Sequence, residues 1–485
     1  MRHDAARRHT RRYLGVGLAL LVALGGMGTA LVLGQAAPVA PLRTIPLQAG
    51  QQPALLALDT QHGRAFVDID IDGGNTTRAP AALLMLDTTT GAPLATIPLA
   101  GTSAALVIDA RQRRVFVAKT TGALAVIDAG TGRTLRTIPV PAPIGWPGGD
   151  APPIGWLAAD AAHRRVWVAS PDEGYGGALL AFDAATGTPR GVWHIVASPL
   201  AMTMDARTRH ALVLSAGVTG APGGAAATYL SVLDAVSGRL LHRASLPGSS
   251  AGGFVVDGAA GRAYVVCSGS TPGAPGRVVV VDTGTGRVLR VVTLRHEPLA
   301  LAVDPGTGHA FVVESGPSTI RQATPGGGMA VTFPTAPGTV IMLDGQGRVV
   351  RTAGVGLAPA ALALDAPHHR LIVTNAGARD AYLAVGMSSY AVRAPAPGPG
   401  GIRLLDTRTG AVERTIDAGV SPASVAVDAG RGRAIVIDVG SFLPVPPSDP
   451  WRWVPPPLRR RLPFLVAPRP SAPLPRISTF DITRW

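Results

Sequence analysis

Short apolar runs recur along the chain, and each is separated from the next by polar turn residues. One copy of this pattern occupies residues 104–109, 114–117, 123–128 and 132–140. Runs of this length that are rich in Val, Ile and Leu predict β-strands, and the short connections between them predict an antiparallel meander. The unit returns roughly every 40–60 residues, which is the period of propeller blades.

Two strands of every unit end in an aspartate. The first strand ends at Asp59, Asp109, Asp160, Asp205, Asp257, Asp304, Asp365 and Asp428. The third strand ends at Asp87, Asp128, Asp183, Asp234, Asp282, Asp344, Asp406 and Asp481. An aspartate at the start of a turn accepts hydrogen bonds from backbone N–H groups, and a following glycine such as Gly91 or Gly132 supplies a positive φ. We therefore predict an all-β, eight-bladed β-propeller whose aspartates are structural, with seven blades as the alternative.

The last unit lacks a fourth strand, since only four residues follow Asp481. A matching sequence lies near the other end of the chain, where residues 42–47 repeat residues 135–140 almost letter for letter. We expect the N-terminal strand to pair with residues 476–481 and to complete the last blade. This pairing would close the ring and remove two exposed sheet edges.

A basic segment and an apolar segment precede the repeats. Residues 1–12 contain five arginines and one acid, and residues 13–34 are predominantly apolar. About 20 apolar residues are enough to span a bilayer as a helix, whereas the apolar region of a cleaved signal peptide has about 7–15. The sequence therefore predicts a transmembrane anchor at 13–34, a linker at 35–41 and a propeller at 42–485.

The flanking charges predict the location of the propeller. The positive-inside rule keeps the basic segment in the cytoplasm and places the propeller outside it, on a single-pass protein of a bacterial-type cell membrane. Cleavage near residues 28–30 or 35–37 is the alternative and would give a secreted protein. Because Leu42 starts a fourth strand so soon after the apolar segment, we expect the tight-turn face of the ring to lie nearest the bilayer.

Composition excludes several classes of site. The net charge of +14 rests on arginine, since Lys119 is the only lysine, and this bias does not by itself predict a nucleic-acid partner. Cys267 is the only cysteine, which excludes an intrachain disulfide, a CxxCH haem site and a thiolate zinc cluster. No P-loop, nucleophile elbow or zincin motif is present in the sequence. We expect a monomer held together by packing.

The seventh unit carries a family signature. The run Leu-Ile-Val-Thr-Asn at 371–375, followed by the strands at 402–406 and 412–416, resembles the YVTN-repeat propellers, the YncE-like family. The resemblance extends over the region from about residue 42 to 485 and implies the propeller fold. Such families include binding, surface-attachment and nucleic-acid-associated proteins, so the resemblance does not select a function.

Long connections are concentrated on one face of the predicted ring. The turns after first and third strands are tight, whereas the connections between second and third strands are expanded at 69–81, 171–177, 216–228, 268–276, 315–338, 376–400 and 439–475. Length variation on one face of a rigid scaffold indicates a binding surface.

The fourth position of the YVTN-like run, here called the slot, lies where each second strand reaches this face. Its polar members are candidate ligand-binding residues at the mouth of the ring: Lys119, Ser170, Ser215, Glu314, Asn375 and Asp438.

Residues 68–73 have the D-x-D-x-D-G spacing that gathers carboxylates around calcium. Asp68, Asp70 and Asp72 are therefore candidate calcium ligands, and no other cofactor is predicted. Ala79 stands where an EF-hand has its bidentate acid, and a straight strand explains the alternation equally well.

The insertion at 439–475 combines many prolines with aromatic and basic residues. Trp451, Trp453, Arg459 and Arg460 are candidate partner contacts, because arginine beside aromatic residues suits a protein, lipid or base surface. An extended loop over the ring is the simpler interpretation.

Two classes of function follow from these observations. The first is a non-enzymatic extracytoplasmic binding or scaffold protein that recognises an unknown protein or cell-envelope partner through its long-loop face. The second is a propeller enzyme, such as a lactonase-like hydrolase or an oxidoreductase, with its site at the mouth of the ring. The sequence supplies no matched acid, base and ligand set for the second class.

Overall fold

The structure is a computed structural model of the whole chain. It describes residues 39–485 except 49, 72–80, 142–153, 173–175, 196, 206, 218–226, 248–249, 270–274, 323–328, 335, 378–379, 386–387, 394–399 and 441–473. The chain separates into two units, Met1–Pro38 and Val39–Trp485, and only the second is described below. Within the described ranges no helix has both the length and the apolar character needed to cross a membrane. The predicted anchor at 13–34 lies outside these ranges.

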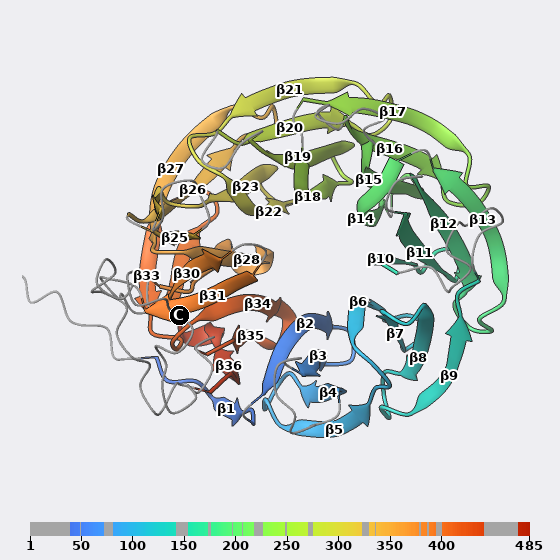
Figure 1. Cartoon of the computed structure of the whole chain (residues 1–485), viewed down its shortest axis with the longest axis horizontal. Helices are drawn as coiled ribbons and strands as arrows, with labels where there is room; N and C mark the ends of the chain where they lie inside the picture. The colour runs from blue at the N-terminus through green and yellow to red at the C-terminus, as the bar shows by residue number, and fades with distance from the viewer. Residues whose placement is uncertain are drawn as a thin grey trace, which may run out of the picture. The chain divides into compact units, whose positions relative to one another are not determined.

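Eight four-stranded antiparallel sheets form the blades, as Figure 1 shows. The first, innermost strands are β2 (Gln51–Asp59), β6 (Ser103–Asp109), β10 (Trp156–Asp160), β14 (Ala197–Asp205), β18 (Ser250–Asp257), β22 (Pro298–Asp304), β28 (Pro359–Asp365) and β34 (Pro422–Asp428). The second strands are β3 (Arg64–Ile71), β7 (Arg114–Lys119), β11 (Arg165–Asp172), β15 (His210–Gly217), β19 (Arg262–Ser268), β23 (His309–Glu314), β29 (Arg370–Asn375) and β35 (Arg433–Asp438).

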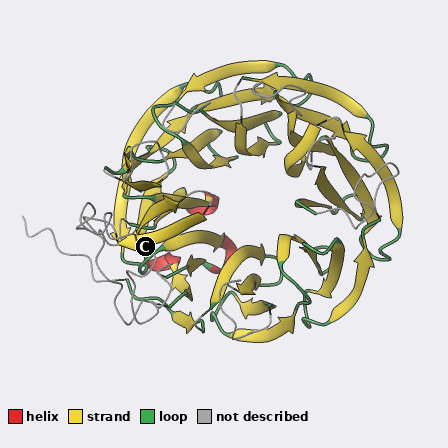
Figure 2. Ribbon diagram, in the orientation of Figure 1, coloured by secondary structure: helices red, strands yellow, loops and turns green. Residues whose placement is uncertain are grey.

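The outer halves of the blades follow the same order. The third strands are β4 (Ala82–Asp87), β8 (Ala123–Asp128), β12 (Gly176–Asp183), β16 (Thr228–Asp234), β20 (Arg277–Asp282), β26 (Gly338–Leu343), β32 (Gly401–Asp406) and β36 (Arg476–Asp481). The fourth strands are β5 (Pro93–Pro98), β9 (Thr134–Pro139), β13 (Pro189–Ile195), β17 (Leu240–Leu246), β21 (Val288–Thr293), β27 (Val349–Gly356), β33 (Val412–Ile416) and β1 (Arg43–Pro46). Helix in the described ranges is limited to the 3₁₀ turns η1 (Ala366–His368), η2 (Ala429–Arg431) and η3 (Ile482–Arg484) (Figure 2).

The blades close into a ring. Each innermost strand contacts the innermost strand of the next blade, from β2 through β6, β10, β14, β18, β22 and β28 to β34, and β34 contacts β2. Figure 1 shows the same circular order in the colours of the chain. The prediction of eight blades is therefore confirmed.

The split blade is also confirmed. Strand β1 pairs antiparallel with β36, with Arg43 opposite Thr479 and Pro46 opposite Arg476. The Leu42 N–H donates to the Thr479 carbonyl at 2.7 Å, and the Leu47 N–H donates to the Pro475 carbonyl at 2.9 Å. Strand β36 thereby has a partner on both sides, because its other edge pairs with β35.

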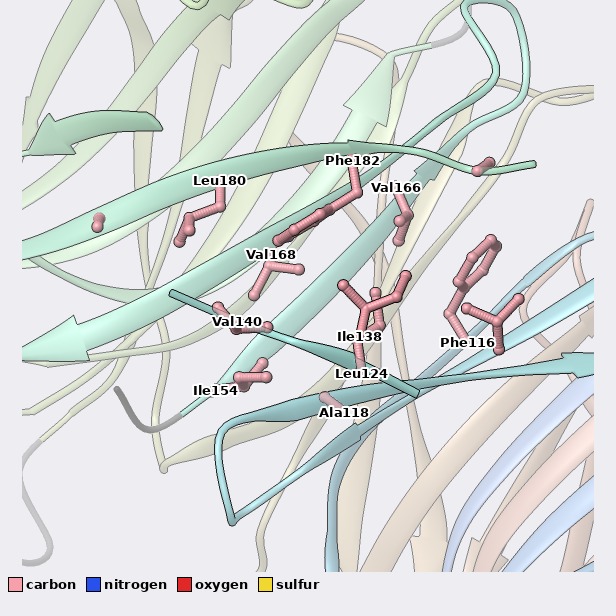
Figure 3. Close-up of a cluster of buried hydrophobic side chains, with 13 residues drawn as sticks. Phe116, Ala118, Leu124, Ile138, Val140, Ile154, Val166, Val168, Leu180 and Phe182 are labelled. Atoms are coloured by element: carbon pink, nitrogen blue, oxygen red, sulfur yellow. The ribbon is translucent and has the colours of Figure 1, made fainter. Parts of the chain in front are cut away.

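Packing between neighbouring blades forms the hydrophobic core. Eight buried clusters each combine residues of two adjacent blades. Figure 3 shows the cluster between the second and third blades, where Phe116 and Ile138 pack with Val168 and Phe182. Strand alternation explains the arrangement, because successive side chains point to opposite neighbours. Each large buried apolar side chain contributes about 1.5–3 kcal/mol.

Aspartates hold the tight turns and join neighbouring blades. In a typical third-to-fourth turn, Asp282 accepts hydrogen bonds from the backbone N–H groups of Gly284 and Thr285 and from the Thr285 hydroxyl at 2.8 Å. The bond from the Thr285 hydroxyl, with smaller contributions from the two backbone groups, lowers the pKa of Asp282 against the opposing effect of burial. First-strand aspartates are buried, and Asp304 accepts a bond of 2.9 Å from the Thr407 hydroxyl of the next blade.

The expanded connections differ from the sequence prediction most in two places. In the third blade, β11 and β12 extend into the predicted 171–177 loop, so that their connection is limited to 173–175. The insertions of the sixth and seventh blades contain β24 (Ser318–Gln322), β25 (Met329–Pro334), β30 (Asp380–Val385) and β31 (Ser388–Arg393). These strands form a ninth sheet, here called the insertion sheet, in which β25 pairs with β30.

Candidate functional site

The polar slot residues lie at the end of their second strands or, for Ser170 and Ser215, two residues before it, where the long-loop face begins. They occupy six of the eight blades, one to a blade, and do not converge on one point. All of them are buried between blades, and Lys119 has the largest exposed fraction, 7%. Glu314 and Asp438, which are 1% exposed, are therefore held inside the framework rather than directed into solvent.

The two acidic slot residues bind the links between blades. Glu314 accepts hydrogen bonds from the backbone N–H groups of Arg295 and His296 at 2.6 and 3.0 Å. It also accepts one from the Thr339 hydroxyl at 2.9 Å. These three donors occupy both carboxylate oxygens, so Glu314 fixes the chain that leads from the fifth blade into the sixth.

Asp438 plays the equivalent part in the last blade. The backbone N–H groups of Val420 and Ser421 each donate to it at 2.9 Å, as does the N–H of Gly440. Arg476 forms an ion pair with it at 3.1 Å. A buried carboxylate needs such donors to offset the free energy of its desolvation.

Among the uncharged slot residues, Asn375 is incompletely bonded. In the seventh blade, the Asn375 amide donates to the Val373 carbonyl at 3.4 Å, while its buried Oδ1 has no hydrogen-bond partner among the described residues. Ser170 and Ser215 are buried at the equivalent positions of the third and fourth blades. The predicted ligand set therefore consists of separate positions with different partners.

Lys119 is the exception among the charged slot residues. No described residue forms a hydrogen bond or an ion pair with its side chain, although it lies at a buried blade interface. Burial lowers the pKa of its ammonium. The turn that follows is closed by a bond from the Gly122 N–H to the Lys119 carbonyl, and the Thr102 and Thr120 hydroxyls lie 2.8 Å apart beside it. Lys119, which has no partner among the described residues, thus directly precedes a turn with two bonded hydroxyl groups on the long-loop face.

The predicted calcium ligands lie in part on a regular strand. Strand β3 is continuous through Ile71, so Asp68 and Asp70 share one face of it, and Asp72 lies outside the described residues. The Ser103 hydroxyl of the next blade donates to Asp68 at 2.9 Å. Burial raises the pKa of Asp68 to about 6, with the Ser103 bond opposing and the charge of Asp70 adding to the shift.

The innermost strands contain few polar groups. Between their ends they carry only apolar, Gly, Pro, Gln, Ser and Thr residues, and the aspartates that end them are buried in the tight turns. Over the described part of the chain, no three His, Cys, Asp or Glu side chains come together as a metal site would require. The candidate arm with Trp451, Trp453, Arg459 and Arg460 lies outside that part.

Comparisons with known proteins identify the fold alone. No family model and no curated protein match the chain. Among solved structures, it is similar to a europium-containing methanol dehydrogenase, with 10% identity and a TM-score of 0.56, over 91% of this chain and 93% of that one. It is also similar to the computationally designed Ika8 protein, with 17% identity and a TM-score of 0.50, over 82% of this chain and 96% of that one. At these identities the YVTN family assignment stays a resemblance.

Sequence reasoning missed the partners of Glu314 and Asp438. Their register offers a signal, because both lie opposite the proline that starts the innermost strand, Pro298 and Pro422. A carboxylate at that position is within reach of the N–H groups that precede the proline. The pairing of the two insertions into one sheet had no comparable signal, since it joins segments about fifty residues apart in the sequence.

Proposed function

We propose that this protein is a non-enzymatic, extracytoplasmic binding or scaffold propeller that recognises its partner on the long-loop face. The observation that carries the proposal is the insertion sheet. Two neighbouring blades each contribute a hairpin, and the hairpins pair through β25 and β30 into one continuous sheet. A surface built jointly by two blades is a feature that ring closure does not require, because the blades are already complete without it.

The contrast between the two faces supports the same proposal. Tight turns repeat in every blade with the same aspartate chemistry, as expected of a framework. The second-to-third connections vary from three residues in the second blade, 120–122, to the long segment between Asp438 and Arg476 in the last. Rigid scaffolds carry recognition on variable connections of this kind.

In this proposal the tight-turn face lies toward the bilayer. Large apolar side chains are exposed where the outer strands begin at that face: Leu42, Leu94, Val236, Leu240, Val288, Leu289, Val349, Val350 and Val412. Exposed arginines flank them in the repeated sequences Arg287-Val-Leu-Arg290 and Arg348-Val-Val-Arg351. We call this set the apolar–arginine rim. Apolar groups interleaved with cations suit the surface of an anionic membrane.

Removal of the insertion sheet tests the proposed recognition surface. Residues 315–337 and 376–400 are each replaced by the Thr-Thr-Gly turn of the second blade, and affinity capture from native envelopes is quantified. A matched control replaces 218–227 of the fourth blade in the same way. We expect an unchanged unfolding temperature and loss of the captured partner only in the first variant. Equal capture by both variants and the wild type would contradict the proposal.

A further inference from the structure

The link into the second blade has the same backbone geometry as the links into the sixth and eighth blades. The residue after the slot donates its N–H to the carbonyl of the residue before the innermost strand in all three. These bonds run from Thr120 to Thr102 at 3.1 Å, from Ser315 to Glu297 at 2.8 Å and from Val439 to Ser421 at 3.1 Å. The register agrees, because Ser103 lies opposite Lys119 as Pro298 lies opposite Glu314.

The slot side chain of the second blade, Lys119, has the opposite charge to the slot side chains of the sixth and eighth blades. In the sixth blade a carboxylate occupies the space beside the link and accepts its N–H groups, and Asp438 does the same in the last blade. In the second blade the corresponding backbone N–H groups belong to Ala100, Gly101 and Thr102. None of the three donates a hydrogen bond to a described residue.

By register, donors of two kinds therefore belong to the position that an acid fills in the sixth and last blades. The Lys119 ammonium is one of them, and the backbone N–H groups of Gly101 and Thr102 are the others. Gly101 has a φ of 88°, which an L-residue rarely adopts, and so the link keeps its turn through a glycine. Lys119 is largely buried, and its ammonium has no counter-ion among the described residues, whereas a bound anion would form charge-assisted hydrogen bonds with all of these donors.

Neither of the described first-blade acids that face this link, Asp68 and Asp70, forms an ion pair with Lys119. Asp68 and Asp70 face the second blade from β3, and Asp68 takes its hydrogen bond from Ser103 rather than from Lys119. The connection 120–122 is also too short to supply an acidic side chain, since it consists of Thr, Thr and Gly. The donors at the second blade thus have no carboxylate from the described part of the chain.

We propose that the slot of the second blade binds an external carboxylate group through the Lys119 ammonium and the backbone N–H groups of Gly101 and Thr102. This inference deepens the proposed function, because the site lies on the long-loop face and defines a chemical class for its ligand. The carboxylate can belong to a small molecule or to the C-terminus of a partner protein, and the two sources share the same recognition chemistry.

Saturation-transfer NMR on the full-length protein tests the site with acetate, succinate, a tripeptide with a free C-terminus and the amide of that tripeptide. We expect the three carboxylates to bind and the amide not to bind. Stronger binding of the tripeptide than of succinate would identify a protein terminus as the source, and the reverse a small molecule. Loss of one charge-assisted contact in Lys119→Met should weaken binding about tenfold to a hundredfold.

Two further variants make the test specific. Lys119→Glu places a carboxylate where Glu314 lies in the sixth blade, so it should abolish binding while protecting from exchange the amides of Ala100 and Gly101, which correspond to Arg295 and His296. Arg277→Met removes an equal charge from the fifth blade and should leave binding unchanged. Equal binding by the wild type and Lys119→Met would overturn the inference. The insertion-sheet deletion should still bind carboxylates, so a failure of the proposed function can be told apart from a failure here.

Discussion

The two faces of the ring use the same residue type, aspartate and its homologue glutamate, in opposite ways. On the tight-turn face an aspartate recurs in every blade and accepts bonds from its own turn, as Asp282 does. On the long-loop face acids occur in only two slots, Glu314 and Asp438, and each binds the link to a neighbouring blade. The first face is thus a repeated framework, whereas the second is a set of individual positions that the blades have filled differently.

This difference shows where sequence variation is tolerated. The slot backbone is held by a main-chain bond that does not depend on the side chain, such as the bond from Thr120 to Thr102. The tight turns have main-chain bonds too, such as the one from Gly286 to Asp282, but every one of them also carries an aspartate whose carboxylate accepts further bonds. The residue type is therefore more variable at the slot than at the turn, and a cation such as Lys119 can occupy the slot without loss of the fold.

The largest effect is expected on the tight-turn face. Asp304→Ala removes the acceptor for the Gly306 N–H and for the Thr407 hydroxyl of the next blade, both at 2.9 Å. Because this carboxylate is 0% exposed, we expect a loss of about 3 kcal/mol in the free energy of unfolding, measured in urea. Asp417→Ala is the control, since Asp417 is exposed and bonds only its own turn. Equal losses in the two variants would remove the distinction.

Substitution of a slot acid should lower the free energy of unfolding by the next largest amount. Glu314→Ala leaves the N–H groups of Arg295 and His296 without their acceptor, and we expect a loss of about 2 kcal/mol. Lys119→Met at the equivalent position should cost less than about 0.5 kcal/mol, because Lys119 has no partner among the described residues to lose. Parallel urea titrations compare the two. A large loss in Lys119→Met would mean that the slot is framework in every blade.

A third prediction concerns pH. The pKa of Asp68 is about 6 in the folded protein against 3.8 as its ordinary value, so the folded state holds the proton more tightly. Stability from this group is complete below about pH 4 and decreases as the pH rises to about 6. Asp68→Asn should therefore be more stable than the wild type by about 1–2 kcal/mol at pH 7 and equal to it at pH 3.5. Thermal unfolding of the variant and the wild type at both pH values measures this difference in stability. A difference that is independent of pH would contradict the burial argument.

The smallest effect is expected at the apolar–arginine rim. In full-length protein reconstituted into anionic nanodiscs, amide exchange in β21 and β27 should be slower than in neutral nanodiscs, by about three- to tenfold. Leu289→Glu should remove the difference. Leu299→Glu is the matched control, because Leu299 is similarly exposed, at 42% against 50%, but lies at the long-loop end of its strand. The same response in both variants would refute a membrane role for the rim.

The sequence predicted the framework because the framework is local and periodic. An aspartate, its glycine and the next apolar run lie within ten residues, and the match of residues 42–47 to 135–140 disclosed the split blade. The insertion sheet could not be predicted in this way, because the strands β26 to β29 lie between β25 and β30 in the sequence. No local sequence pattern indicates that β25 and β30 pair, or in which register. The slot contacts were missed for another reason. Their partners are backbone N–H groups, which every residue except proline provides and which leave no trace in composition.

The pairing of β1 with β36 also constrains when the molecule can finish folding. The Thr44 and Ser478 hydroxyls lie 3.2 Å apart although 434 positions separate them in the chain. At about 5–20 residues per second, ribosomes need about 20–90 s to make the intervening chain. Throughout that interval β1 lacks its pairing partner, while the other seven blades can fold. The ring is therefore complete only when β36 has been synthesised. Without β36, the edges of β1 and β35 that pair with it would be exposed.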